Sequence, residues 1–177
     1  MNRGKIEKGV RLILEGIDED LTRPGLQKTP RRVAEMCEEI FGGIHQKPTF
    51  TTGFSEAVGD QLICIKNIRF YSVCEHHLLP FFGKMDIFYI PRDQRVAGFS
   101  SFSKIVDTFA RRPQIQERLG QQIADAIMAS LNPVGMMVLI EATHLCASMR
   151  GAHKKELKTV TQVIRGKLPA KKLRFCK

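Results

Sequence analysis

Two short clusters of cysteine and histidine, far apart in the sequence, have the residue types of a metal site. They are Cys74, His76 and His77 in the first cluster and His144 and Cys146 in the second. Thiolate sulfur and imidazole nitrogen are the usual ligands of tetrahedral zinc in proteins. Because residues i and i+2 of a strand point to the same face, we expect His144 and Cys146 to address one site together. The two clusters therefore predict a shared metal site.

The number of ligands distinguishes a catalytic metal site from a structural one. If Cys74, His77 and Cys146 bind the metal, the fourth position stays open for water, as is typical of catalytic zinc. The remaining histidines, His76 and His144, could then transfer protons in a hydrolysis. A closed structural site that uses four of the five residues is an alternative. In another alternative no metal binds, the cysteines are small buried side chains and the histidines lie at the surface.

Hydrophobic periodicity predicts the elements that must position these clusters. The expected helices are 5–17, 30–41, 100–109 and 113–131, and the expected strands are 61–73, 81–90, 134–149 and 157–164. Residues 44–60 are rich in Gly, Pro, Thr and Ser and predict a loop. This order predicts an α+β domain whose sheet has one face covered by helices and a face or edge free for another subunit. We expect a helical segment at 1–43, a main domain at 44–166 and a basic tail at 167–177.

The composition is that of a globular chain of 177 residues, 43% hydrophobic and 26% charged. No apolar run approaches the ~18 residues that a membrane span requires, and the N-terminus lacks the features of a signal peptide. The five cysteines are odd in number and irregularly spaced, which argues for a reducing compartment. We therefore expect a cytoplasmic protein with no membrane partner.

The net charge of +10 is concentrated at the C-terminal end of the chain. Residues 150–177 contribute +9, and the first 149 residues contribute only +1. A basic tail of this kind suggests an anionic ligand or nucleic acid as a partner. The alternative is a solvated end without a partner.

Several stretches together resemble the GTP cyclohydrolase I family, the zinc enzymes that open pterin biosynthesis. They are QKTPRRVAEM (27–36), CEHHLLPFFGK (74–84), YIP (89–91), RRPQIQERLGQQIADAI (111–127), EATHLCASMRG (141–151) and KTVTQ (158–162). The resemblance implies the tunnelling fold, in which two antiparallel strand pairs carry helices on one face and the sheets join between subunits into a barrel. It also implies a homo-oligomer, a decamer with active sites between subunits.

The resemblance assigns roles to the residues at matching positions. It makes Cys74, His77 and Cys146 the Zn²⁺ ligands, His76 and His144 the acid–base pair, Glu117 the carboxylate that binds guanine with Gln116 and Ser100 nearby, and Arg150, Arg32 and Lys104 the phosphate contacts. The role of Glu117 agrees with its chemistry, because a carboxylate only accepts hydrogen bonds and guanine offers two adjacent donors. GTP is therefore the expected small-molecule substrate, and nucleic acid is not an expected partner.

The implied reaction is hydrolysis of the purine imidazole ring of GTP at C8, with release of formate. Zinc lowers the pKa of its bound water, and His76 and His144 transfer protons. The ribose then rearranges to give 7,8-dihydroneopterin triphosphate, in the first step of pterin and tetrahydrofolate biosynthesis.

The chain departs from the family pattern at Ser101 and again in the C-terminal part after Thr161. The family usually has a lysine after Gly-Leu-Ser, and Ser101 stands in its place here. The basic C-terminal residues Lys154, Lys155 and Arg165 could compensate for the lost phosphate contact. Alternatively, the chain is a diverged relative that acts on another guanine nucleotide or stops at the ring-opened formamide. A non-catalytic member that binds zinc and nucleotide is the third alternative.

Overall fold

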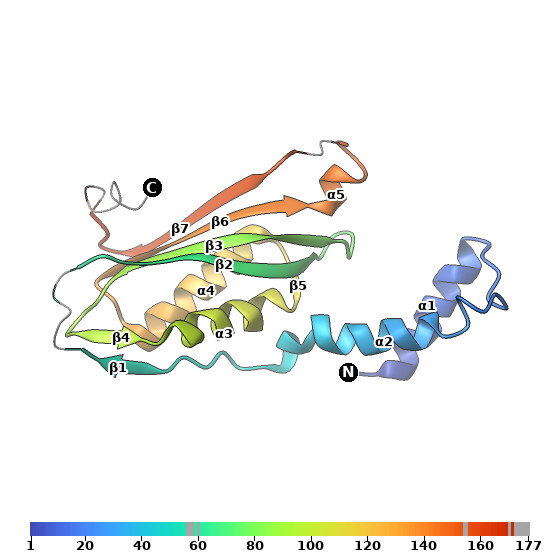
Figure 1. Cartoon of the computed structure of the whole chain (residues 1–177), viewed down its shortest axis with the longest axis horizontal. Helices are drawn as coiled ribbons and strands as arrows, with labels where there is room; N and C mark the ends of the chain where they lie inside the picture. Colours follow the sequence, from blue (N-terminus) through green and yellow to red (C-terminus); the bar gives the residue numbers. More distant parts are fainter. Residues whose placement is uncertain (56–58, 60, 154–155, 170, 172–177) are drawn as a thin grey trace. The chain divides into compact units, whose positions relative to one another are not determined.

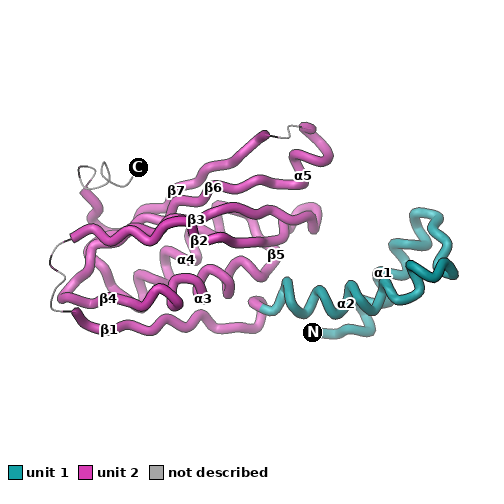
Figure 2. Tube along the Cα trace, viewed as in Figure 1, with its two compact units in different colours: residues 1–42 teal, residues 43–177 magenta. Residues whose placement is uncertain are grey.

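The computed structural model describes residues 1–177 except 56–58, 60, 154–155, 170 and 172–177. The chain divides into two compact units, Met1–Gly42 and Gly43–Lys177 (Figure 2). Among the described residues, no helix combines the length and the apolar character that crossing a membrane requires. Most of the predicted basic tail lies outside the described residues, as do Lys154 and Lys155.

The smaller unit consists of two helices, α1 (Arg3–Gly16) and α2 (Thr29–Ile40), at the places where the sequence predicts them. The side chain of Asn2 caps α1 by accepting a hydrogen bond from the Lys5 backbone N–H at 2.9 Å. The apolar residues at the end of α1 are not buried within the chain, since Ile13 and Ile17 are 65% and 66% exposed.

The larger unit is built on a five-stranded sheet in the order β5-β2-β3-β6-β7 (Figure 1). Its antiparallel strands are β2 (Ile63–Cys74), β3 (Pro80–Ile90), β6 (Gly135–His144) and β7 (Thr159–Gly166). The short β5 (Pro113–Gln114) runs parallel to the end of β2, beside Val73 and Cys74. Pairing of β3 with β6 joins the two predicted strand pairs into one sheet.

Two helices, α3 (Phe99–Ala110) and α4 (Gln116–Leu131), cover one face of this sheet (Figure 1). Because successive side chains of a strand point to opposite faces, alternate strand residues meet the helices. The buried core includes Phe102 and Ile105 of α3, Leu119, Ile123 and Ile127 of α4, and Phe81, Met85, Ile87, Val138 and Ile140 of the sheet. The prediction of an α+β domain with helices on one face is confirmed.

Several short elements were not predicted. A 3₁₀ turn, η1 (Gly42–His45), precedes β1 (Thr52–Phe54), which pairs antiparallel with β4 (Arg95–Ala97). The predicted loop at 44–60 is therefore wrong in part, because strands of three residues are too short to show a periodic pattern. The helix predicted at 113–131 begins only at Gln116, since the preceding residues form β5.

The strand predicted at 134–149 is too long. β6 ends at His144, and a short helix, α5 (Leu145–Ser148), follows directly. The neighbouring strands explain the break, because β3 begins at Pro80 and β7 begins only at Thr159. Beyond them a longer β6 would leave its backbone N–H and C=O groups without partners, whereas a helical turn pairs them internally.

The sheet has two open edges. β5 lies beside only Val73 and Cys74 of β2, and no strand of the described residues lies on the outer side of β7. Open strand edges are ready to pair with another chain. Closure of the sheet into a barrel between subunits stays a prediction.

Candidate active site

A tight turn at one end of the sheet positions the first cluster. Cys74 is the last residue of β2, and its N–H donates to the Leu79 carbonyl at 2.8 Å. Its own carbonyl accepts from the Leu78 N–H, also at 2.8 Å. These two bonds close the turn that carries the two histidines between β2 and β3.

An arginine that the sequence analysis did not single out ties this turn to α4. Arg118 forms an ion pair with Glu75, and its Nε donates to the Gln114 side chain at 3.0 Å. The hydrogen bond and the charge of Arg118 hold the pKa of Glu75 below its usual range. No local sequence pattern could have predicted this contact, because the two partners are 43 residues apart.

The second cluster reaches the same end of the sheet from β6. His144 lies opposite Phe81 in the register of β3 and β6, and Phe81 stands next to the start of β3. Past His144 the chain turns through α5, which carries Cys146. The prediction that Cys146 lies on the same strand as His144, two residues along, is therefore wrong, and a helical turn brings Cys146 to the site instead.

Cys74, His77 and Cys146 form a group that could hold a metal ion. Their sulfur and ring nitrogen atoms lie within 4.8 Å of one another, and the two sulfur atoms are 3.9 Å apart. A tetrahedral zinc ion with Zn–S distances of about 2.3 Å would separate two sulfur ligands by about 3.8 Å. Among the described residues no fourth ligand joins this group, so water or a substrate atom could complete the coordination.

The electrostatics of the two thiols fit a cation site. Burial raises the pKa of Cys146, and a hydrogen bond with Cys74 and the proximity of that second thiol add to this shift. The charge of Arg150 acts in the opposite direction. Two thiolates this close repel each other unless a cation lies between them, and a bound metal would supply that charge.

His76 and His144 lie beside this group without belonging to it. His76 is exposed, and its Nδ1 is 3.9 Å from the Cys74 sulfur. The ring of His144 stacks on Phe81, with 4.7 Å between centroids and 2° between planes. Burial lowers the pKa of His144, and the charge of Glu117 opposes that shift. The stacked ring is thus held in place and is mostly neutral, able to accept a proton, at neutral pH.

The start of α4 contributes the two residues that the resemblance places at the guanine. Glu117 is exposed in the first turn of α4, and its charge acts on His144. Gln116 is only 1% exposed, and its Nε2 donates to backbone carbonyls of β6 and β7 and to the Thr161 hydroxyl, each at 3.1 Å. Its Oε1 has no hydrogen-bond partner among the described residues. Gln116 therefore ties α4 to the sheet, and its Oε1, which is buried as well, is left without a hydrogen bond within the described residues.

Two residues that the resemblance places at the substrate, Ser100 at the guanine and Lys104 at the phosphates, lie on α3 away from this end of the sheet. Ser100 and Lys104 are exposed on α3, and the far end of that helix is the part that approaches the site, where the Ser72 hydroxyl donates to the Ala110 carbonyl at 2.7 Å. With a rise of about 1.5 Å per residue, Ser100 lies about 15 Å back along the helix. Arg32 lies on α2, in the other unit.

Ser101, in the place of the family's lysine, points into the protein. It is 5% exposed, and its hydroxyl both donates to the Thr51 carbonyl and accepts from the Thr51 N–H, at 3.2 Å each. Its hydroxyl is therefore used within the chain and is not presented to solvent.

Arg165 does not serve the site within its own chain. It lies opposite Met136 near the end of β7, and its Nε donates to Asp125 at 2.7 Å. The site end of β7 is at Thr159, six residues earlier and about 20 Å away in an extended strand. The prediction that Arg165 compensates for Ser101 is not supported by this position.

Fold and site together define an α+β protein with a Cys–His–Cys group, fit for a metal ion, beside two histidines at one end of its sheet. A family model described as GTP cyclohydrolase I matches residues 6–175. The chain is 49% identical to the GTP cyclohydrolase 1 of Acetivibrio thermocellus over 94% of this chain and 89% of that protein. It is 52% identical to the GTP cyclohydrolase 1 of Desulforamulus reducens, over 92% and 87% of the two chains. The chain belongs to the GTP cyclohydrolase I family of enzymes, as its motifs predict.

A solved structure shares the fold of the larger part of the chain. It is the apo form of an archaeosine synthase QueF-Like, with a TM-score of 0.51 and 22% identity. The match covers 63% of this chain and 99% of that chain. At this level of identity the likeness concerns the fold alone.

Proposed function

We propose that the chain is a zinc-dependent hydrolase that opens the imidazole ring of GTP at C8, releases formate and yields 7,8-dihydroneopterin triphosphate. The observation that carries this proposal is the group of Cys74, His77 and Cys146 with an open fourth position. His76 and His144 stand beside that group and are not needed to form it. Membership of the GTP cyclohydrolase I family supports the same reaction.

The residues around the metal group would have different roles in the reaction. Zinc bound there would supply a Lewis acid and a water molecule of lowered pKa. His144, held against Phe81 and mostly neutral, would accept a proton, and the exposed His76 would exchange protons with the substrate and with solvent. Arg118 would hold the turn with the metal ligands through its ion pair with Glu75.

Glu117 would select guanine over adenine as the base of the nucleotide substrate. Its carboxylate could accept hydrogen bonds from N1–H and the 2-amino group of guanine, and it would repel the acceptor at N1 of adenine. A site that accepts hydrogen bonds from such donors discriminates strongly against an analogue that lacks them. The position of Glu117 near His144 supports this role, because it would place the base beside the proton-transferring histidine.

We also propose that the active site is completed by a second chain in a barrel-forming oligomer, a decamer. Ser100 and Lys104 lie back along α3 from the metal group, so another subunit would have to supply the guanine contact of Ser100 and the phosphate contact of Lys104. The open edges of β2 and β7 and the exposed Ile13 and Ile17 support self-association.

The shared site can be tested by mixing two variants. Cys146→Ala should be inactive, and Lys104→Gln should raise the KM for GTP. In co-assembled oligomers, some sites would combine Cys146 of one chain with Lys104 of the other, so part of the activity should regain the wild-type KM. A fully active monomer in analytical ultracentrifugation would contradict the proposal.

A second candidate function is the same chemistry on a guanine nucleotide with fewer phosphates. The burial of Ser101 favours it, because the position offers no cation to a triphosphate. Formate release should therefore be compared for GTP, GDP, GMP and ATP. Preference for GTP with no reaction of ATP supports the proposed function, preference for GDP or GMP supports the second candidate, and equal reaction of ATP would remove Glu117 as the base selector.

The cytoplasm is the proposed location. The described cysteines Cys37, Cys64, Cys74 and Cys146 form no disulfide, and thiol ligands of a metal centre need a reducing compartment.

A further inference from the structure

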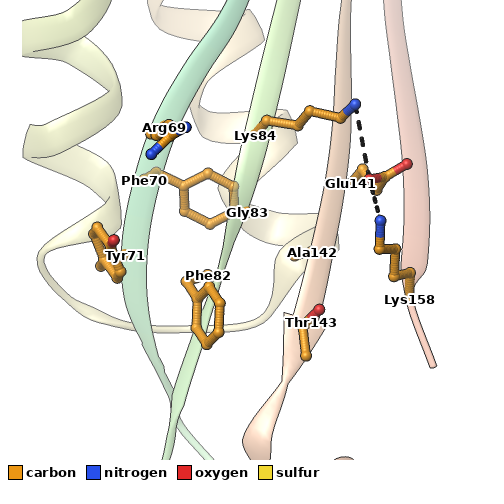
Figure 3. A pocket seen from close by; sticks show the side chains of 10 residues that line it. All are labelled: Arg69, Phe70, Tyr71, Phe82, Gly83, Lys84, Glu141, Ala142, Thr143 and Lys158. Atoms are coloured by element: carbon orange, nitrogen blue, oxygen red, sulfur yellow. Dashed lines mark hydrogen bonds and ion pairs between the residues drawn. The ribbon is translucent and has the colours of Figure 1, made fainter. Parts of the chain in front are cut away.

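The sheet face opposite α3 and α4 carries two adjacent rows of side chains with different chemistry (Figure 3). One row crosses β2, β3 and β6 as Arg69, Lys84 and Glu141, which are direct cross-strand neighbours. In the next row, Tyr71 is the direct neighbour of Phe82. Together with Lys158, which directly precedes β7, these residues line a cavity of about 340 Å³, called here the outer-face pocket.

The row of Arg69, Lys84 and Glu141, together with Lys158, carries more positive than negative charge. Arg69 and Lys84 lie directly opposite each other, and like charges in such a pair destabilise a sheet. The Lys84 Nζ is 3.8 Å from Glu141, but Lys158 binds the same carboxylate oxygen more closely, at 3.0 Å. Among the described residues Arg69 has no ion-pair partner. An anion placed between Arg69 and Lys84 would relieve their repulsion.

The neighbouring row offers an apolar surface next to these cations. The rings of Tyr71 and Phe82 stack, with 5.9 Å between centroids and 29° between planes. Tyr71 is 72% exposed and Phe82 is 37% exposed, so the pair presents aromatic surface that the chain itself does not cover. A planar ring packs favourably against such a surface.

We propose that the outer-face pocket binds a small aromatic anion, a planar ring that carries a carboxylate, sulfonate or phosphate group. The ring would pack on Tyr71 and Phe82, and the acidic group would pair with Arg69 and Lys84. The cavity volume lies in the range of small-molecule sites. The pocket is separate from the proposed active site, since none of the residues given catalytic, metal or substrate roles lines it.

The proposed barrel would leave this pocket accessible to small molecules. Strand pairing through the edges of β2 and β7 would place α3 and α4 outside, so the opposite face would line the central space. A small ligand could therefore reach the pocket in the assembled protein, where a folded partner could not.

The test uses 2-naphthoate as the probe and the assembled full chain in isothermal titration calorimetry at low salt. We expect one 2-naphthoate per chain. The neutral 2-naphthylmethanol and the non-aromatic cyclohexanecarboxylate should each bind at least about tenfold more weakly, because each lacks one of the two interactions.

Arg69→Gln should weaken 2-naphthoate binding about tenfold or more, the effect of losing a charge-assisted hydrogen bond. Arg11→Gln, the same change at an exposed position of α1, should have no effect.

Three outcomes would overturn the proposal. In the first, 2-naphthoate binds equally well to Arg69→Gln and Tyr71→Ala, which would place it at the metal or another site. In the second, it binds no more tightly than 2-naphthylmethanol. In the third, wild type does not bind it and Arg69→Gln dissociates the oligomer, which would show that a carboxylate of another copy occupies the pocket. Formate release from GTP should be unchanged in Arg69→Gln, so failure here is distinguishable from failure of the proposed function.

Discussion

Replacement of Gln116 separates a structural role from a substrate-binding role. The resemblance places this residue at the guanine, yet its amide nitrogen is within 3.1 Å of three oxygen atoms of β6, β7 and Thr161. Gln116→Met keeps the length of the side chain and removes its hydrogen bonds. We expect this variant to be less stable whether or not GTP is present.

The size of the effect follows from the number of hydrogen bonds. An amide nitrogen has two hydrogens, so two of the three contacts can be well formed at one time. At about 0.5–1.5 kcal/mol per bond, Gln116→Met should lower the free energy of unfolding by about 1–3 kcal/mol. For a chain of this length each kcal/mol shifts Tm by about 2–4 °C, so the expected loss is about 2–12 °C.

The assay is thermal unfolding at a fixed protein concentration, together with the KM for GTP. Gln121→Met is the matched control, because Gln121 is exposed on the same helix. If Gln116→Met has the Tm of this control and only its KM is raised, the structural role argued here is refuted and Gln116 acts on the substrate through its amide. A lower Tm together with a raised KM would be consistent with the structural role, because the hydrogen bonds of Gln116 also position the neighbouring Glu117 at the start of α4.

The metal ligands, the histidines and the turn give three further predictions. Cys146→Ala should lose both zinc and turnover, and stoichiometric zinc in this variant by elemental analysis would contradict the ligand set. His76→Ala and His144→Ala should keep zinc and lose about 10²–10⁴-fold in turnover; wild-type formate release by either variant would remove that residue from the mechanism. Arg118→Met should weaken metal binding by about 10–100-fold in competition with a chelator, and an unchanged affinity would show that its ion pair with Glu75 does not orient the ligands.

Much of the candidate site could be predicted because residue type alone carries the signal. Thiol and imidazole side chains are the ligands that zinc prefers, so their two clusters predicted a shared metal site. The resemblance to the family then selected Cys74, His77 and Cys146 from the five candidate residues. The helices α3 and α4 were predictable for a similar reason, since Phe102, Ile105, Leu119 and other core residues recur at helical spacing.

The remaining features depend on contacts between distant parts of the chain. β6 stops at His144 because its neighbours stop there, which the apolar pattern of residues 134–149 cannot show. The ion pair of Arg118 with Glu75 likewise arises only when α4 packs on the sheet, and the burial of Ser101 arises only when the segment before β1 packs against α3. Sequence pattern thus predicted the long helices and strands and the residue types of the metal site. Tertiary packing determined the short elements, the residue at which each long element ends and which polar groups are hydrogen-bonded within the chain.

The most direct test of the account is formate release from GTP by the purified chain, measured after metal removal and again after addition of zinc. We predict no release from the metal-free chain and full recovery at one zinc per chain, bound by Cys74, His77 and Cys146. Full formate release from the metal-free chain, or none from the chain with one zinc bound, would contradict the account.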